Sequence, residues 1–330
     1  MASTEAIREG NRLALSRLLT QVENDSPEGR AALAELFPYT GRAHLLGVTG
    51  APGTGKSSLV NQLALHYRKQ TKQKVAIVAV DPSSPFTGGA VLGDRVRMRD
   101  LSGDEGVFIR SMASRGSLGG IAKKTAAVVQ IFDAAGYEVI FIETVGAGQS
   151  EVDIARLTHT TVVVEAPGLG DDIQAIKAGI LEIADVLVIN KADRPGVENT
   201  ERALRSNLAL AHPTKRVLRH HGLDMTVMAP VTDPTIWIPP IHKTVATEGK
   251  GIAEVADSIS RHAEHLRHNG DWTARDRDRL GSEMEALLRE ALMDRFLERI
   301  PQKTYDDMVE NVVKRNISPY EAVNILLNGK

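Results

Sequence analysis

Residues 50–57 read Gly-Ala-Pro-Gly-Thr-Gly-Lys-Ser, a complete G-x-x-x-x-G-K-[ST] motif, and no other stretch constrains the fold as strongly. The motif follows the apolar residues 45–49 and opens into a helix-like pattern at residues 58–63, so its context is strand, glycine-rich turn and helix. Glycines let backbone N–H groups curl around phosphate oxygens, and the helix N-terminus adds partial positive charge. Lys56 can then reach the β- and γ-phosphates, and the Ser57 hydroxyl can bind Mg²⁺. The bland alternative is a flexible glycine loop before a core helix, but the complete motif predicts a nucleoside-triphosphate site.

The composition excludes several kinds of protein. Of the 330 residues, 42% are hydrophobic, which is enough for one large core with helical additions. The formal net charge of -2 argues against a general nucleic-acid binder. Cysteine is absent, so disulfides, thiolate zinc sites and cysteine nucleophiles are excluded. Because residues 1–5 show no signal-peptide pattern and no 18-residue apolar run occurs, we expect a soluble, cytoplasmic protein without membrane contact.

Two aspartates follow the apolar run at residues 75–80, which suits a parallel strand covered on both faces. Asp81 ends this run, and Asp94 lies in the polar loop after it. Because α/β sheets bind ligands at the carboxyl ends of their strands, both carboxylates could approach a metal ion or its waters. Aspartate also caps helices and turns routinely, so taken alone the two roles stay open.

A further strand is predicted at residues 137–142, and it runs directly into Glu143, with Gly146 three residues later. After a phosphate loop, such an acid holds Mg²⁺ through water and the glycine N–H bonds the γ-phosphate, so that hydrolysis releases the loop. The next predicted strand, residues 160–165, leads into a glycine-punctuated loop at 167–177. This loop is either a second mobile segment or an ordinary strand-to-helix turn.

An N-K-x-D element occupies residues 190–193, directly after the apolar run at 184–189. The Asp193 carboxylate can accept hydrogen bonds from N1–H and the 2-amino group of guanine, a donor pair that adenine lacks. The Lys191 stem can pack along the base. A lone N-K-x-D is common, but in this order after the phosphate loop and the acidic strand end it predicts GTP over ATP.

The whole chain divides into three predicted parts: an N-terminal helical extension at 1–43, a P-loop nucleotide domain at 44–268 and a C-terminal helical arm at 269–330. A last strand is predicted over 237–246, where the backbone around Ala246 could complete the base pocket. Apolar residues at helical spacing mark the arm, which we expect to pack on its own domain or on a second copy. They are Leu280, Met284, Leu287, Leu288, Ala291, Leu292 and Phe296.

Two histidine groups are candidates for metal binding. His262, His265 and His268 are spaced to share one helix face, and His220 and His221 form the second group. No carboxylate or thiolate framework accompanies either group, so a solvated helix face is the default interpretation.

With these pieces assembled, the sequence resembles the MeaB/ArgK/MMAA family, the GTPase chaperones of adenosylcobalamin-dependent acyl-CoA mutases, over nearly its whole length. The resemblance is carried by strings far more specific than a phosphate loop. They are GAPGTGKSS at 50–58, VAVDPSSPFTGGAVLGDRVRM at 78–98, SLGGIAKKT at 117–125, FIETVGAGQSE at 141–151, GDDIQAIKAG at 170–179 and NKAD at 190–193.

This resemblance implies an α/β fold, a P-loop GTPase domain with a mostly parallel sheet flanked by helices, and a C-terminal arm that pairs two subunits. The implied nucleotide-binding residues are Gly53, Thr54, Gly55, Lys56, Ser57, Ser58, Gly146, Asn190, Lys191, Asp193, Val245 and Ala246. The implied Mg²⁺ site comprises Ser57, Asp81, Asp94 and Glu143, and the implied catalytic set Lys56, Arg97, Asp81 and Glu143. The loop at 167–177 matches the extra switch by which the family signals to its mutase. One departure is Val245-Ala246 in place of the usual Ser-Ala pair, which removes a side-chain hydroxyl.

The leading functional prediction is a chaperone whose GTP cycle gates cofactor loading or repair in a mutase. Intrinsic hydrolysis is expected to be slow because Gln149 lies six residues after Glu143. The water-orienting glutamine of signalling GTPases lies about four residues after its acid, so Gln149 is not placed for that role. A nickel-metallochaperone GTPase is the alternative from another class, which the absence of cysteine weakens. A transport-associated kinase is a third, but no phosphoacceptor pocket is recognisable.

Overall fold

A computed structural model describes residues 4–82, 98–101, 103–114, 118–144, 150–168, 181–211, 215–220, 223–228 and 236–328. Contacts divide the chain into two compact units, residues 1–279 and residues 280–330. The first unit therefore extends past the expected boundary at 268 and takes in the first residues of the following helix. No helix among the described residues combines the length and apolar character needed to cross a membrane.

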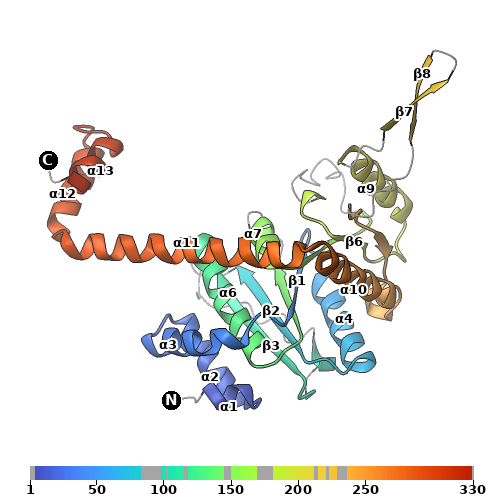
Figure 1. Cartoon of the computed structure of the whole chain (residues 1–330), viewed down its shortest axis with the longest axis horizontal. Helices are drawn as coiled ribbons and strands as arrows, with labels where there is room; N and C mark the ends of the chain where they lie inside the picture. The colour runs from blue at the N-terminus through green and yellow to red at the C-terminus, as the bar shows by residue number, and fades with distance from the viewer. Residues whose placement is uncertain are drawn as a thin grey trace. The chain divides into compact units, whose positions relative to one another are not determined.

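A parallel sheet forms the centre of the first unit (Figure 1). It has seven strands in the order β3-β2-β4-β1-β5-β6-β9. The central strands are apolar at nearly every position because helices cover both faces. The strands are β1 (His44–Thr49), β2 (Val75–Pro82), β3 (Val107–Ser114), β4 (Val139–Thr144), β5 (Thr160–Glu165), β6 (Val186–Ile189) and β9 (Ile241–Lys243). An antiparallel hairpin of β7 (Lys215–His220) and β8 (Leu223–Met228) stands apart from this sheet.

Helices cover both faces of the sheet, and their apolar side chains form a separate cluster with the strands on each face. On one face, α4 (Lys56–Gln70) and α10 (Ile252–Asn269) pack on the sheet through residues such as Leu59 and Val255. On the other face, α6 (Leu118–Ala134) and α7 (Ser150–Leu157) share a cluster with the N-terminal helices. A smaller cluster joins α9 (Val197–Ala211) to β5 and β6. This arrangement confirms the predicted α/β fold with a parallel sheet flanked by helices.

The N-terminal extension consists of α1 (Thr4–Arg8), α2 (Arg12–Glu23), α3 (Pro27–Leu36) and a single 3-10 turn, η1 (Phe37–Tyr39). Its apolar face is buried against α6. The linker to β1 is fixed by the Asp133 carboxylate on α6, which accepts hydrogen bonds from the backbone N–H groups of Gly41 (2.6 Å), Arg42 (3.2 Å) and Ala43 (3.1 Å). The extension therefore packs on the helices that cover this face of the sheet.

The remaining elements complete both units. Short 3-10 turns are η2 (Arg99–Leu101) and η4 (Ala246–Glu248), and the C-terminal helices are α11 (Asp271–Arg299), α12 (Gln302–Val313) and α13 (Pro319–Asn328). Pro301 caps α12 and Pro319 begins α13, as their positions predict. The predicted last strand at 237–246 is much shorter than expected, because Pro239 and Pro240 have no N–H to donate to a sheet. The edge strand β3 was not predicted.

Candidate nucleotide site

The phosphate-binding loop joins the end of β1 to the start of α4, where its glycines are required for steric reasons. Gly50 has φ 135°, and a Cβ atom there would lie 2.1 Å from the carbonyl oxygen of Val164. Gly55 has φ 93°, and a Cβ atom there would lie 2.3 Å from Nδ2 of Asn190. Both backbone conformations are costly for other residues, so the loop is closely built against its neighbours.

Lys56 is buried, and its ammonium group lies within the loop. Nζ donates hydrogen bonds to the carbonyl oxygens of Gly50 (2.8 Å) and Ala51 (3.0 Å). Thr54 is also buried, and its hydroxyl donates to the Ala51 carbonyl oxygen (3.0 Å). Ser58 lies on the first turn of α4, partly exposed. The cation is thus held in place by neutral acceptors that anionic phosphate oxygens could replace.

Ser57 and Glu143 bring the loop and the acidic strand end into direct contact. The Ser57 hydroxyl donates to Oε1 of Glu143 over 2.5 Å, and both residues are buried. A hydroxyl and a carboxylate are hard oxygen donors of the kind that Mg²⁺ binds, so the pair fits this ion. The backbone of Asp81 lies at the end of β2, the strand next to β4. Four predicted positions fall outside the described part of the chain: the side chain of Asp81, and the residues Asp94, Arg97 and Gly146.

Asn190 connects the phosphate loop to the segment after β9. Its Nδ2 donates to the Thr54 carbonyl oxygen (2.9 Å), and its Oδ1 accepts from the Thr244 hydroxyl (3.1 Å) and the Ala246 N–H (3.1 Å). The side chain is buried, and these bonds engage both ends of its amide. Asn190 therefore links the phosphate loop to the segment after β9, with both ends of its amide engaged within the protein.

Thr244 is a site residue that the sequence interpretation missed. The hydroxyl expected at position 245 is absent because Val245 stands there, but Thr244 supplies a buried hydroxyl one residue earlier. In the sequence, this role could have been recognised only from the hydroxyl residue two positions before Ala246. The Ala246 N–H already bonds Asn190, and Val245 pairs with Lys250 in an isolated bridge that shapes the turn.

Lys191 and Asp193 follow the buried Asn190 and are more exposed than it. Lys191 adopts φ 57°, an unusual conformation for a residue with a side chain, and its Nζ donates to the Gly53 carbonyl oxygen (2.6 Å). Its stem thereby lies over the phosphate loop. The Asp193 side chain is exposed. The structure thus brings residues 53–57, Glu143 and residues 190–193 to one edge of the sheet.

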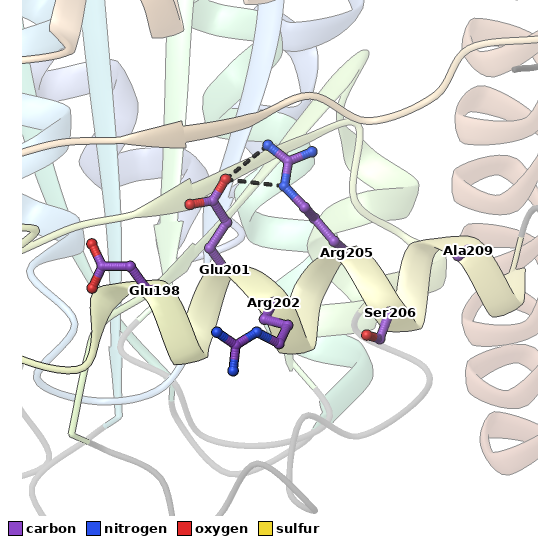
Figure 2. Close-up of a pocket in the computed structure, with 6 residues that line it drawn as sticks. All are labelled: Glu198, Glu201, Arg202, Arg205, Ser206 and Ala209. Carbon is purple, nitrogen blue, oxygen red and sulfur yellow. Dashed lines mark hydrogen bonds and ion pairs between the residues drawn. The ribbon is translucent and has the colours of Figure 1, made fainter.

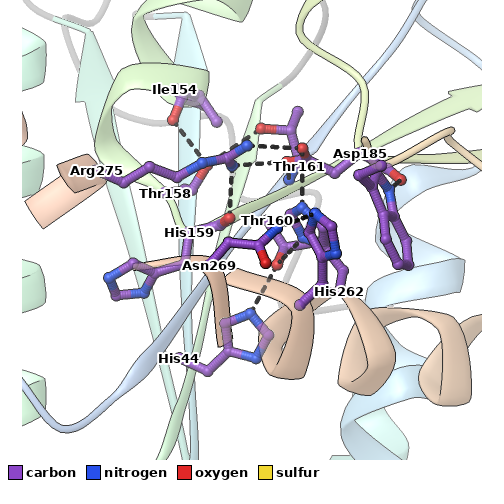
Figure 3. Close-up of polar contacts among 12 residues, drawn as sticks. His44, Ile154, Thr158, His159, Thr160, Thr161, Asp185, His262, Asn269 and Arg275 are labelled. Carbon is purple, nitrogen blue, oxygen red and sulfur yellow. Dashed lines mark hydrogen bonds and ion pairs between the residues drawn. The ribbon is translucent and has the colours of Figure 1, made fainter. Parts of the chain in front are cut away.

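A second polar cluster lies at the opposite edge, where β1, β5 and β6 begin (Figure 3). It corrects the default interpretation of the histidines, because His262 is buried instead of solvated. Its Nδ1 lies 2.9 Å from the Thr160 hydroxyl and its Nε2 lies 3.2 Å from Oδ1 of Asp185. No group of three or more His, Asp or Glu side chains suited to a metal ion occurs in the part of the chain that the structure describes. The side chains of His220 and His221 lie outside it.

A surface hollow of about 410 Å³ lies over α9, and the described residues that line it all come from this one helix (Figure 2). Arg205 bonds Glu201 within one turn, at 2.8 Å and 3.0 Å. Glu201 also pairs with Lys243 over 2.6 Å. The described lining residues all belong to α9, and none of them is part of the nucleotide motifs.

A phosphate loop, an acidic strand end and an N-K-x-D loop at the carboxyl edge of a parallel sheet define the class of P-loop GTPases. A solved structure described as an LAO/AO transport system kinase has this fold, with a TM-score of 0.67 and 26% identity, over 98% of this chain and 94% of that one. The family model described as methylmalonyl Co-A mutase-associated GTPase MeaB matches residues 15–300, and the chain belongs to this family.

Two relatives illustrate the range of the similarity. A protein of Pyrococcus abyssi named as a GTPase is 43% identical over 323 residues, which cover 98% of this chain and 94% of that protein. The methylmalonic aciduria type A homolog of Caenorhabditis elegans is 29% identical over 306 residues, which cover 88% of this chain and 73% of that protein. The similarity thus includes the helical extensions as well as the motifs.

Proposed function

We propose that this chain is a cytoplasmic chaperone that hydrolyses GTP to GDP and phosphate, and so gates cofactor loading, protection or reactivation of an adenosylcobalamin-dependent acyl-CoA mutase. One observation carries the proposal. The phosphate loop, Glu143 and residues 190–193 meet at one sheet edge in a chain whose family is named for association with methylmalonyl-CoA mutase. GTP is the substrate, and the mutase is the partner.

Ser57, Glu143, Asp81 and Asp94 are the residues that we propose for Mg²⁺, directly or through water. Support comes from the buried Ser57–Glu143 pair, whose oxygens lie 2.5 Å apart at the start of α4. When bound, the ion would neutralise charge on the β- and γ-phosphates. Glu143 would then exchange its hydrogen bond from Ser57 for contact with the ion or its water.

Lys56 and the surrounding backbone would stabilise the charge that develops during hydrolysis. The ammonium is already desolvated and held by two carbonyl oxygens at 2.8 Å and 3.0 Å, so little reorganisation is needed when phosphate oxygens replace them. N–H groups of residues 53–58 would bind the α- and β-phosphates, and that of Gly146 the γ-phosphate. This set binds the nucleotide but includes no described group placed to activate water.

Guanine would be recognised by Asp193, which accepts from both donors on one edge of the base. The Lys191 stem would pack on the base, in keeping with its bond to the Gly53 carbonyl oxygen. Backbone at Val245 and Ala246 would complete the pocket, held in place by the Thr244 and Asn190 side chains. Asn190 acts here by bracing the two loops.

We further propose that the mutase accelerates a slow intrinsic reaction by placing Arg97 against the transferring phosphate. An arginine supplied in this way raises GTP hydrolysis by about 10³–10⁵-fold in other GTPases. Arg97 immediately precedes Met98 in the sequence, and Met98 is fully buried in the apolar cluster that also contains Leu59 of α4.

Single-turnover hydrolysis with and without purified mutases tests both proposals. Candidates are the methylmalonyl-CoA, ethylmalonyl-CoA and 2-hydroxyisobutyryl-CoA enzymes. We expect one of them to accelerate wild type, and Arg97→Ala to bind GTP with nearly unchanged affinity while losing most of the stimulation. Arg277→Ala, at an exposed position of α11, should retain it. Full stimulation of Arg97→Ala would exclude Arg97, and stimulation by none of the mutases, with none captured from cell extract, would contradict the chaperone function.

A homodimer through residues 280–330 is also proposed. Within this unit α11 leaves Met284, Leu288 and Leu292 respectively 68%, 54% and 56% exposed, and a second copy would bury this stripe. Truncation after Arg279, which leaves the first unit complete, should give a monomer that still binds GDP. Sedimentation of the full chain as a monomer at micromolar concentration would contradict this prediction.

A further inference from the structure

The strands that lead to the guanine-reading segments are the shortest in the sheet. β6 has four residues and runs directly into residues 190–193, and its neighbour β9 has three and runs into residues 244–246. At about 3.3 Å per residue, β6 spans about 13 Å. Contacts that fix the amino end of β6 therefore act on the base-reading loop through one short, stiff segment.

Asp185, the residue immediately before β6, is the anchor at that end (Figure 3). Its Oδ2 accepts from the Thr161 N–H at 2.8 Å and from Arg275 at 2.9 Å. Its Oδ1 accepts from the second Arg275 nitrogen at 2.9 Å and lies 3.2 Å from Nε2 of His262. The Asp185 carbonyl oxygen also accepts from the Trp237 indole (2.7 Å). One residue thus ties β6 to β5, α10, α11 and the segment before β9.

Arg275 supplies two of these bonds from the second turn of α11. The same guanidinium donates to the His159 carbonyl oxygen (2.6 Å), so its fork is fully oriented. The Asp185 side chain is only 10% exposed. Burial alone would raise the pKa of Asp185, but the hydrogen bonds from His262 and Arg275 hold that pKa below its ordinary value. Removing Arg275 would leave a buried carboxylate with an incomplete set of donors.

The first turns of α11 are held at this place by a second set of contacts. The Trp272 ring stacks on His159 with centroids 3.8 Å apart, and Asp276 Oδ1 lies 3.1 Å from Nε2 of His159. Nδ1 of His159 accepts from the Leu45 N–H (3.1 Å), which makes Nε2 the donor to Asp276. The start of α11 is therefore built into the amino edge of the sheet.

We propose that Arg275 is a positioning residue for guanine recognition. By holding Asp185, the start of α11 sets the position of β6 and of the loop at 190–193, and thereby controls GDP release. This inference rests on the proposed role of that loop in reading guanine. It makes α11 a place where a bound partner would alter nucleotide exchange without touching the nucleotide.

The test compares a base-dependent probe with a phosphate-only probe. Dissociation of a fluorescent N-methylanthraniloyl GDP is measured by stopped flow, and binding of Mg²⁺–pyrophosphate by competition, for wild type and Arg275→Met. We expect GDP dissociation to accelerate by about tenfold, within the usual range of coupling between sites, with pyrophosphate affinity within about twofold of wild type. The control is Arg277→Met, since Arg277 is exposed on the same helix. It should match wild type in both measurements.

Other outcomes separate this inference from the proposed function. If wild type prefers GDP over ADP and Arg275→Met releases GDP at the wild-type rate, the inference is wrong. The same holds if pyrophosphate and GDP weaken equally, because that would be general damage to the loop. Absence of any GDP preference in wild type would instead contradict the proposed function. If Arg275→Met does not fold, Arg275→Lys decides, since it keeps the charge without the fork: intermediate acceleration supports the inference and an unchanged rate overturns it.

Coupling is reciprocal, which gives a second measurement on the unmodified protein. GDP should slow hydrogen exchange of backbone amides in residues 272–279, whereas pyrophosphate should not. Equal protection by both probes, or by neither, would contradict the assignment of Arg275.

Discussion

The two edges of the parallel sheet are both rich in polar side chains, but these are organised differently. At the amino edge, Asp185, His262, Arg275 and Thr160 bond one another, and their donors and acceptors are matched within the protein. At the carboxyl edge, Lys56 bonds backbone carbonyl oxygens, and Asp193 is exposed. Polar groups that satisfy each other maintain the fold, whereas a lysine bonded to neutral carbonyl oxygens and an exposed carboxylate can exchange their partners for a ligand.

The largest expected effect is a loss of stability when the polar cluster at the amino edge is disrupted. Asp185→Ala leaves Arg275 and His262 without their buried partner, so we expect the free energy of unfolding to fall by about 3–5 kcal/mol. Urea denaturation measures this, with Asp278→Ala on the exposed side of α11 as the control. A loss below about 1 kcal/mol, the size typical of an average substitution, would show that the cluster contributes little to the fold.

The next effect, at the carboxyl edge, should be on activity instead of stability. Lys56→Ala removes the charge that the phosphates require, so GTP hydrolysis should fall by about 100-fold or more. Stability should change by no more than about 1 kcal/mol, because the hydrogen bonds of Lys56 to Gly50 and Ala51 lie within the loop that it helps to shape. Lys69→Ala, exposed near the end of the same helix, should leave both quantities unchanged. Comparable losses of stability in Lys56→Ala and Asp185→Ala would remove the distinction between the edges.

Lowering the pH should also reduce the stability of the protein through the amino edge, by a smaller amount. Burial, followed by the neighbouring His159 and Arg267, holds the pKa of His44 well below its ordinary value, and burial also lowers the pKa of His159 despite Asp276. The unfolded chain takes up these protons below about pH 6.5, but the folded protein does not. Stability should therefore be fully present above that pH and decline as the pH falls, by at most about 1.4 kcal/mol per pH unit for each histidine.

Thermal unfolding between pH 7.5 and 5.5 checks this prediction. His159→Gln should flatten the decline, and His268→Gln, at an exposed position, should not. A stability that is constant or rises on acidification would contradict the neutral state assigned to His44 and His159.

The contrast between the edges also explains what the sequence could predict. The carboxyl edge uses short contiguous motifs, so residues 50–57, 143 and 190–193 are recognisable in the sequence alone. The amino edge is assembled from residues as far apart as His44 and Arg275, and nothing local distinguishes a buried His262 from a solvated one. Thr244 was missed for the same reason, because its role depends on contact with Asn190, which follows the neighbouring strand β6.

The same contrast applies to the strands: the buried strand β2 could be predicted from the sequence, and the edge strand β3 could not. The run at 75–80 was recognisable because both faces of β2 are covered and nearly every residue is apolar. The edge strand β3 mixes Phe108 and Met112 with Arg110, whose guanidinium pairs with Glu23 of α2. Such pairing with a distant helix cannot be read from the strand itself.

The central claim is that the carboxyl edge of this sheet reads guanine through Asp193, and nucleotide selectivity tests it most directly. Titration calorimetry with GDP, ADP and xanthosine diphosphate should show wild type binding GDP at least about 100-fold more tightly than ADP, because adenine leaves the Asp193 carboxylate unpaired. Asp193→Asn should weaken GDP and strengthen xanthosine diphosphate, whose 2-oxo group accepts from the new amide. Equal affinities of wild type for GDP and ADP would contradict the account.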